Sequence, residues 1–135
     1  MKKTLWRDAS GATAIEMALL LPALLSLAFG AMAFGVGFWT KNVLQSAAQE
    51  AARCIAINGS ACSAVPTGCD STSASVCYVE TVSKKRGFTR LAAAEISVNP
   101  TATTAGVSFT TVTITHSFSL LKYSTIMVAK GSFPN

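Results

Sequence analysis

An uncharged run of about 24 residues, from Met17 to Thr40, most constrains how this chain can fold. As an α-helix rising about 1.5 Å per residue, the run would extend roughly 36 Å, enough to cross a hydrocarbon core of about 30 Å. Trp6 and Trp39 flank it, as aromatic residues commonly do at membrane interfaces. Basic residues within the first seven positions predict a cytoplasmic N-terminus, with the rest of the chain on the other side. The run therefore predicts a single membrane-spanning helix.

The remainder of the 135-residue chain can form only a small core. The formal net charge is +5, but three of the cations precede the apolar run, where they control topology. A second cluster, Lys84 to Arg86, is too short to indicate a polyanionic partner, and we interpret it as a solvated helix end. The sequence therefore predicts no nucleic-acid binding.

A cleaved secretory signal peptide is the main alternative to a membrane span. Two N-terminal lysines and the sequence AMA at 31–33 fit such a signal. The apolar run, however, continues to Trp39, where a mature soluble protein would usually turn polar. Glu16 also stands at the head of the apolar run, which normally tolerates no acid in a signal peptide. We therefore favour the span.

Glu16 needs an explanation, because an acidic residue within a bilayer costs about 2.5–3.5 kcal/mol on insertion scales. One interpretation is that Glu16 snorkels at the interface or stabilises the start of the helix, where a carboxylate is favoured by the helix dipole. Asp8 or Ser10 could cap the helix equally well. That interpretation leaves unexplained the depth of Glu16 and the presence of Gly11 five residues earlier.

The order of Gly11, the sequence ATAIE and an unbroken apolar helix resembles the class III signal of type IV pilins and pseudopilins. The longer sequence GATAIEMALLLPALL, with Pro22 at the eleventh position after the glycine, resembles the opening of TadE-like proteins, minor pseudopilins of the tight-adherence (Flp) pilus. The sequence VLQSAAQEAARCIAI at 43–57, which includes Arg53, resembles the segment that follows the membrane helix in that family. The resemblance is dense over residues 10–57 and diffuse beyond.

The resemblance implies that a prepilin peptidase cuts between Gly11 and Ala12 on the cytoplasmic side of the inner membrane. Residues 1–11 would be the leader, 12–40 the transmembrane helix and 41–135 an extracytoplasmic, pilin-like head. The expected partners are the peptidase, other pilins or pseudopilins and the inner-membrane assembly platform. Cleavage would create an α-ammonium at Ala12 that can pair with Glu16 of a neighbouring subunit, because each charge offsets the other in lipid.

The long helix is expected to continue past the membrane, from about Thr13 to Ile57, and to end before Asn58-Gly59. Its outer half places apolar residues at helical spacing, namely Val43, Ala47, Ala51 and Cys54. Pro22 is expected to kink or locally unwind the membrane half.

Two pairs of small residues at i, i+4 spacing, Ala31/Gly35 and Ala33/Gly37, would let another helix approach closely. Glycine is common in membrane helices, so a single pair would carry little weight. As a cluster, the four residues favour lateral packing in a fibre or against the platform.

The C-terminal part predicts a short helix and three strands. Residues 71–87 are predicted to form a helix that Thr72 or Ser73 could cap, although the β-branched content also fits a strand. Alternating patterns predict strands at 95–99, 106–118 and 124–133, with Pro100 ending the first and a loop at 100–106. The predicted fold class is therefore α+β, in which a long N-terminal helix enters a small head with a short helix and a three-stranded antiparallel sheet.

Four cysteines follow the span at spacings of eight, seven and eight, with no C-x-x-C or C-x-x-H. Two disulfides are expected in an extracytoplasmic segment. We favour the nested pairing, in which Cys54 joins Cys77 and Cys62 joins Cys69, because it would link the end of the long helix to the second helix. The sequential pairing, Cys54–Cys62 with Cys69–Cys77, stays close behind.

No motif predicts a metal site, a cofactor or catalysis. His116 is the only histidine and lies in a strand pattern, which favours a structural role. We therefore expect a substrate of the peptidase rather than an enzyme. Two further hypotheses stay open, an uncleaved bitopic membrane protein whose head binds an extracytoplasmic partner and a secretion-system pseudopilin.

Overall fold

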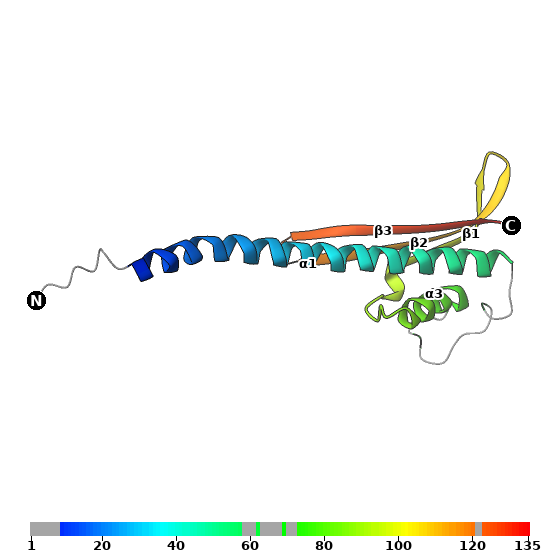
Figure 1. Cartoon of the computed structure of the whole chain (residues 1–135). Helices are drawn as coiled ribbons and strands as arrows, with labels where there is room; N and C mark the ends of the chain where they lie inside the picture. Colours follow the sequence, from blue (N-terminus) through cyan, green and yellow to red (C-terminus); the bar gives the residue numbers. More distant parts are fainter. Residues whose placement is uncertain (1–8, 58–61, 63–68, 70–72, 121–122) are drawn as a thin grey trace, which may run out of the picture. The chain divides into compact units, whose positions relative to one another are not determined.

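The computed structural model describes residues 9–57, 62, 69, 73–120 and 123–135. Over these residues the chain forms a long helix, a short helix and a three-stranded sheet, which confirms the predicted α+β class (Figure 1). The chain divides into two compact units, residues 1–36 and 37–135. We call the described part of residues 37–135 the head.

Helix α1 spans Ala9–Ala56, so it begins four residues before the expected start and ends one residue before the expected end. It continues through Pro22, so the expected local unwinding there is wrong, whereas the alternative, a kink, stays a prediction. The missing proline N–H removes one backbone hydrogen bond, and the bonds of the flanking turns maintain the helix. Asn58 and Gly59, the expected C-cap pair, lie outside the described residues.

Helix α3, Ala74–Lys85, confirms the predicted short helix. Ser73 stands at its N-cap, but its hydroxyl makes no capping bond and instead lies 3.1 Å from the hydroxyl of Ser75. Gly87 follows the helix with a φ of +90°, a conformation that glycine adopts without a steric penalty. The backbone N–H groups of Gly87 and Phe88 donate to the carbonyls of Lys84 and Ser83, which ends the helix.

The sheet is an antiparallel meander in the order β1-β2-β3. Strand β1 covers Ile96–Thr104 and β2 covers Val107–Leu120, while β3 covers Tyr123–Pro134. The expectation that Pro100 ends the first strand is wrong, because β1 resumes its pairing after an irregularity between Asn99 and Ala102. An edge strand tolerates proline at such an irregularity. The predicted loop at 100–106 is thus mostly strand, and Ala105 and Gly106, both at positive φ, form the tight turn.

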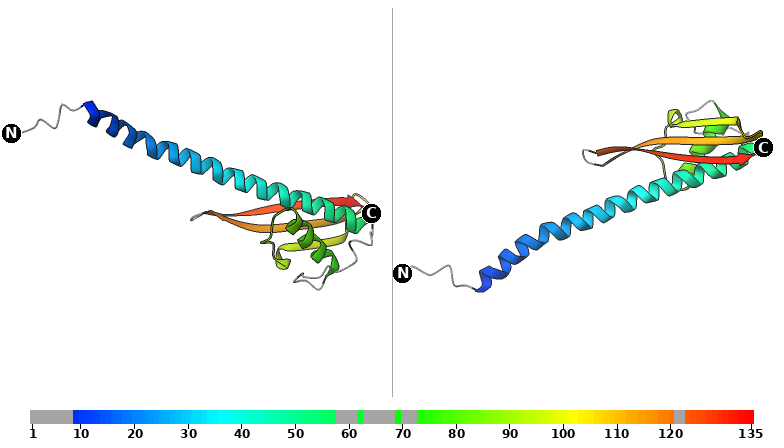
Figure 2. Two further views of the ribbon diagram at one scale, coloured as in Figure 1. Left: turned by 60° about the horizontal axis from the view of Figure 1, so that its bottom comes forward. Right: turned by 90° about the horizontal axis from the view of Figure 1, so that it is seen from above.

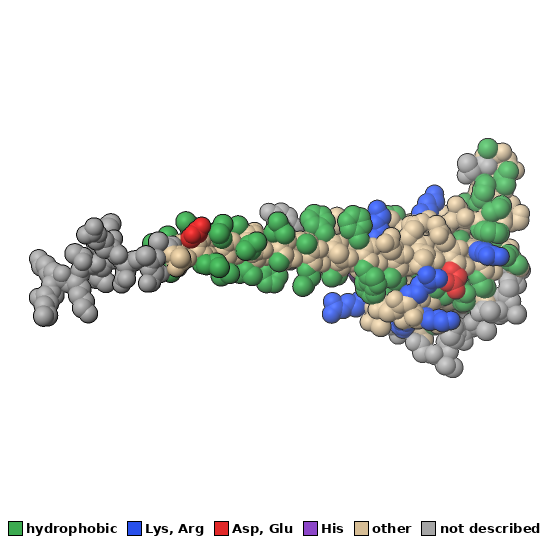
Figure 3. Space-filling view, in the orientation of Figure 1, with side chains coloured by type: hydrophobic (Ala, Val, Ile, Leu, Met, Phe, Trp, Pro, Cys, Tyr) green, Lys and Arg blue, Asp and Glu red, His purple; other side chains and the backbone are tan. Residues whose placement is uncertain are grey.

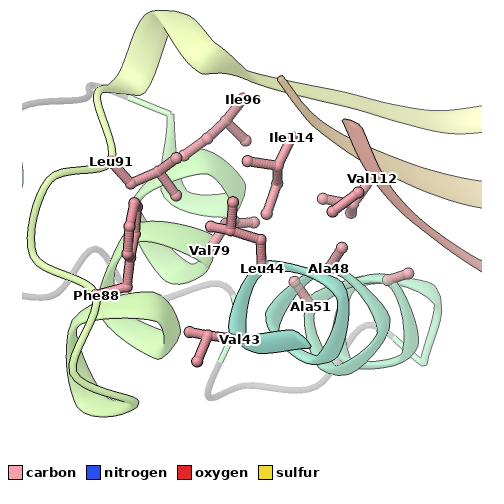
Figure 4. Close-up of a cluster of buried hydrophobic side chains, with 12 residues drawn as sticks. Val43, Leu44, Ala48, Ala51, Val79, Phe88, Leu91, Ile96, Val112 and Ile114 are labelled. Atoms are coloured by element: carbon pink, nitrogen blue, oxygen red, sulfur yellow. The ribbon is translucent and has the colours of Figure 1, made fainter. Parts of the chain in front are cut away.

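The core of the head lies where the outer half of α1 meets the sheet and α3 (Figures 2 and 4). The predicted stripe on α1 is confirmed, since Val43, Ala47 and Ala51 are buried and Cys54 is half-buried. A parallel row at the next helical positions is also buried. Its members, Leu44 and Ala48, lie close to Val112 and Ile114 of β2, as Figure 4 shows, and belong to the same apolar cluster. Small side chains on α1 therefore let the helix lie directly on the sheet.

One glycine on β3 makes the closest approach between α1 and the sheet. A Cβ atom built on Gly131 would lie 2.2 Å from the carbonyl oxygen of Ala48 and 2.6 Å from the backbone nitrogen of Gln49. Beside it, the Gln45 side-chain amide donates to the Lys130 carbonyl at 2.8 Å and accepts from the Lys130 N–H at 3.3 Å. The side chain of Gln45 thus pairs with the backbone of β3 as a neighbouring strand would.

Candidate functional site

The residues predicted for processing and assembly all lie on α1. Gly11 and Ala12 lie in its first turn, where the backbone N–H groups have no intrahelical acceptor. A peptide bond in this turn can leave the helical conformation at little cost in hydrogen bonds. Glu16 follows Ala12 by four residues, so the two positions lie on one face of the helix. The Glu16 side chain is exposed.

The surface of α1 around and beyond Glu16 is apolar on all sides. In the 18-residue stretch that defines the candidate membrane span, no part is buried against the rest of the described chain. Among the described residues, this helix is the one long and apolar enough to cross a membrane. Its exposed large side chains between Ile15 and Phe38 include Leu19, Leu27 and Phe34. A helix that is apolar all round needs lipid or other helices around it.

The small residues predicted to pack against another helix leave open space in the part of the chain that the structure describes. A Cβ atom built on Gly35 or Gly37 would meet no heavy atom within 4 Å. Ala31 is exposed and Ala33 is half-buried. Both pairs therefore leave room for a second helix, and packing through them stays a prediction.

The four cysteines form two disulfides, but the favoured nested pairing is wrong. Cys54 is bonded to Cys62, with their Cα atoms 6.1 Å apart, and Cys69 is bonded to Cys77, with their Cα atoms 5.6 Å apart. The sequential pairing, kept as the close alternative, is confirmed. Each bond joins cysteines that are eight residues apart in the sequence. Cys54 lies in the last turn of α1, and Cys77 lies in the first turn of α3.

The link between the two helices that we had assigned to a disulfide is made by charged side chains. The Arg86 guanidinium donates to the Ser46 hydroxyl at 2.6 Å and forms an ion pair with Glu50. Burial and the nearby charge of Glu50 raise the pKa of the Tyr78 hydroxyl above its usual value. Arg86 is exposed at the end of α3, as predicted, but its partners Ser46 and Glu50, about 40 residues away in the sequence, were not foreseen.

Lys84 also has a partner that the sequence did not reveal. Glu80 is only 2% exposed, and its Oε1 lies 2.6 Å from the Lys84 ammonium nitrogen. The other carboxylate oxygen of Glu80 has no hydrogen-bond partner among the described residues. The i, i+4 spacing of Glu80 and Lys84 could have indicated the ion pair, but it could not show that the Glu80 carboxylate is buried.

Removing the Lys84 cation should destabilise the head. Lys84→Met leaves a buried carboxylate uncompensated, and we expect a loss of about 1–3 kcal/mol, since Lys84 itself is partly exposed. The measurement is the urea midpoint of the full chain in detergent, followed by near-UV circular dichroism. Lys85→Met is the matched control, because Lys85 is exposed and forms no ion pair among the described residues. Equal midpoints for the two variants would contradict this role of Lys84.

His116 has the contacts of a packed, hydrogen-bonded side chain. Its Nδ1 lies 2.9 Å from a carboxylate oxygen of Glu95, and its ring packs edge-on against Phe88 with centroids 5.0 Å apart. Glu95 also accepts a hydrogen bond from the Ala92 N–H at 3.1 Å. Within the described residues, no three His, Cys, Asp or Glu side chains lie together as a metal site would require.

Comparison with known proteins gives one match. Residues 11–53 match the family model described as TadE-like protein. No curated protein and no solved structure matches the chain. The matched segment begins at Gly11, contains Glu16 and Pro22 and ends at Arg53 in the last turn of α1. Residues 11–53 of this chain are therefore similar to the TadE-like family, as the sequence resemblance had indicated.

Proposed function

We propose that this chain is a minor pseudopilin of a tight-adherence pilus. A prepilin peptidase cuts it between Gly11 and Ala12, and the subunit then packs among other pilins through the apolar part of α1. The observation that supports this proposal most is that the TadE-like match begins at Gly11 and covers a helix whose apolar surface is exposed on all sides. The inner-membrane location with a cytoplasmic N-terminus belongs to the same proposal.

Glu16 is the assembly residue in this proposal. Within one chain it follows Ala12 by a single helical turn, and its side chain is exposed. The α-ammonium created at Ala12 and the carboxylate of a neighbour's Glu16 can compensate each other's desolvation. This pairing would fix the axial register at which a subunit joins the fibre.

We expect Glu16→Ala to leave cleavage intact and to lower incorporation into sheared pili at least tenfold. The reason is that an unpaired ammonium in lipid carries a penalty of about 2.5–3.5 kcal/mol. Incorporation is measured by immunoblotting the sheared and the membrane fractions. Gln49→Ala is the control, because it removes an exposed polar side chain on the same helix outside the apolar run. Unchanged incorporation of Glu16→Ala would contradict the register role.

The two other hypotheses predict different outcomes. An uncleaved membrane-anchored binding protein would keep residues 1–11, and its level in the membrane would not depend on the peptidase. A secretion-system pseudopilin would be cleaved but would enter a different filament. Co-purification with subunits of the tight-adherence pilus or of a secretion pseudopilus separates these two cleaved forms.

A further inference from the structure

The head carries more positive charge than its own carboxylates can neutralise. Its three described carboxylates, Glu50, Glu80 and Glu95, are engaged by Arg86, Lys84 and His116 respectively. Besides Lys41 at the start of the head, four further cations are exposed and form no ion pair among the described residues. They are Arg53, Lys85, Arg90 and Lys130. On the face shown in Figure 3, the Lys and Arg side chains accordingly gather on the head.

Contacts within the head place some of these cations beside the end of the apolar run. A Cβ atom built on Gly87 would lie 3.6 Å from the Trp39 ring, so the turn after α3 packs against Trp39. Trp39 is the last aromatic residue of the uncharged run, and half of its surface is exposed. An exposed tryptophan at the end of a span is typical of the membrane interface. The turn at Gly87 therefore lies at the level where the helix leaves the bilayer.

Three cations that form no ion pair within the described residues lie within three residues in sequence of Trp39 or Gly87. Lys41 follows Trp39 by two residues, Lys85 precedes Gly87 by two residues, and Arg90 follows Gly87 by three. All three are exposed. We call Lys41, Lys85 and Arg90 the basic collar. The sequence cluster at 84–86 was too short to indicate a polyanion, but the fold adds residues from α1 and from the segment after α3.

We propose that the basic collar binds the anionic phospholipid headgroups of the outer leaflet, so that the head rests on the membrane before the subunit enters a fibre. The proposal depends on the membrane span but not on cleavage after Gly11. Charge complementarity favours lipid phosphate, because the collar lies at the interface and its cations form no ion pair with any carboxylate that the structure describes. Each Lys or Arg near an anionic surface strengthens binding roughly fivefold at moderate salt.

The test uses the full chain in nanodiscs of phosphatidylcholine alone or with a third of phosphatidylglycerol. Hydrogen exchange is measured by mass spectrometry on the peptide that covers residues 86–92. We expect the anionic lipid to slow exchange in this peptide at least fivefold, and 0.5 M salt to remove the effect, since salt screens surface charge.

Two charge-matched variants separate the collar from a general effect of net charge. Lys85→Gln/Arg90→Gln should abolish the slowing, whereas Arg53→Gln/Lys130→Gln, which removes two exposed cations outside the collar, should retain it. Equal urea midpoints would show that both variants fold. Loss of the effect in both variants, or no effect of phosphatidylglycerol on the wild-type chain, would overturn the proposal.

Two further outcomes identify another occupant of the collar. Glycerol phosphate added to phosphatidylcholine nanodiscs should leave exchange unchanged, and equal slowing by this soluble anion would overturn the assignment to lipid. If phosphatidylglycerol has no effect while Lys85→Gln/Arg90→Gln lowers pilus incorporation, the collar contacts an acidic surface of a protein partner instead. That result would also overturn the lipid proposal, and it would leave the cleavage site after Gly11 untouched.

Discussion

Gly131→Val should destabilise the head by about 3 kcal/mol or more, at the upper end of the range for overpacked cores. The Cβ position of residue 131 lies 2.2 Å from the Ala48 carbonyl oxygen and 2.4 Å from the Ala48 carbonyl carbon. These are backbone atoms of a helix, so no side-chain rotation can relieve the overlap. Helix α1 would have to move away from β3, which would open the apolar cluster around Leu44 and Val112.

The Gly131 prediction is measured as the urea midpoint of the full chain in detergent. Gly131→Ala should give an intermediate loss, because its single methyl group already overlaps the helix backbone. Ser132→Val is the control, since it places the same side chain on the neighbouring, exposed position of β3. A wild-type midpoint for Gly131→Ala would mean that α1 does not approach the sheet as closely as described here.

Removing both disulfides should leave the head largely unfolded at 37 °C. Each bond joins cysteines eight residues apart, and closing a loop of this size stabilises a fold by about 2–3 kcal/mol in the chain-entropy model. The summed loss of about 5 kcal/mol is comparable with the whole stability of a small domain. Alanine is the suitable replacement, because Cys77 is fully buried and a serine hydroxyl there would need a partner.

The cysteine prediction is tested with three variants, one for each bond and one for both. Cys54→Ala/Cys62→Ala and Cys69→Ala/Cys77→Ala should each lower the urea midpoint, and the variant without both bonds should show no cooperative transition at 37 °C. Peptide mapping without reduction should recover the pairs Cys54–Cys62 and Cys69–Cys77. A wild-type transition in the variant without both bonds would contradict the assigned contribution, and a Cys54–Cys77 peptide would contradict the pairing.

Features with a local periodic signal could be predicted from the sequence. The apolar run and its helical continuation gave α1, and strict alternation over 106–118 gave β2 within two residues. Pro100 misled the prediction of β1, because proline excludes a residue from a central strand but is tolerated on an edge. Whether a strand is central or at an edge depends on the order of the whole sheet, which local sequence does not specify.

Contacts between distant residues could not be predicted. The ion pair of Arg86 with Glu50 and the approach of Gly131 to Ala48 each depend on how separate elements pack. The disulfide pairing was undetermined for a related reason, since the cysteine spacings of eight, seven and eight fit both pairings. At the candidate site the situation is reversed. Gly11 and Glu16 were predicted from a resemblance in sequence, and the structure adds that the helix around them is exposed and apolar.

The intact mass of the chain purified from membranes tests the proposed processing most directly. In cells with an active prepilin peptidase, we predict a mass that begins at Ala12, and in cells without the peptidase a mass that includes residues 1–11. Gly11→Val should keep the longer mass in both backgrounds, because the peptidase cuts directly after glycine in the family that this sequence resembles. A chain that keeps residues 1–11 in the presence of active peptidase would contradict the proposal.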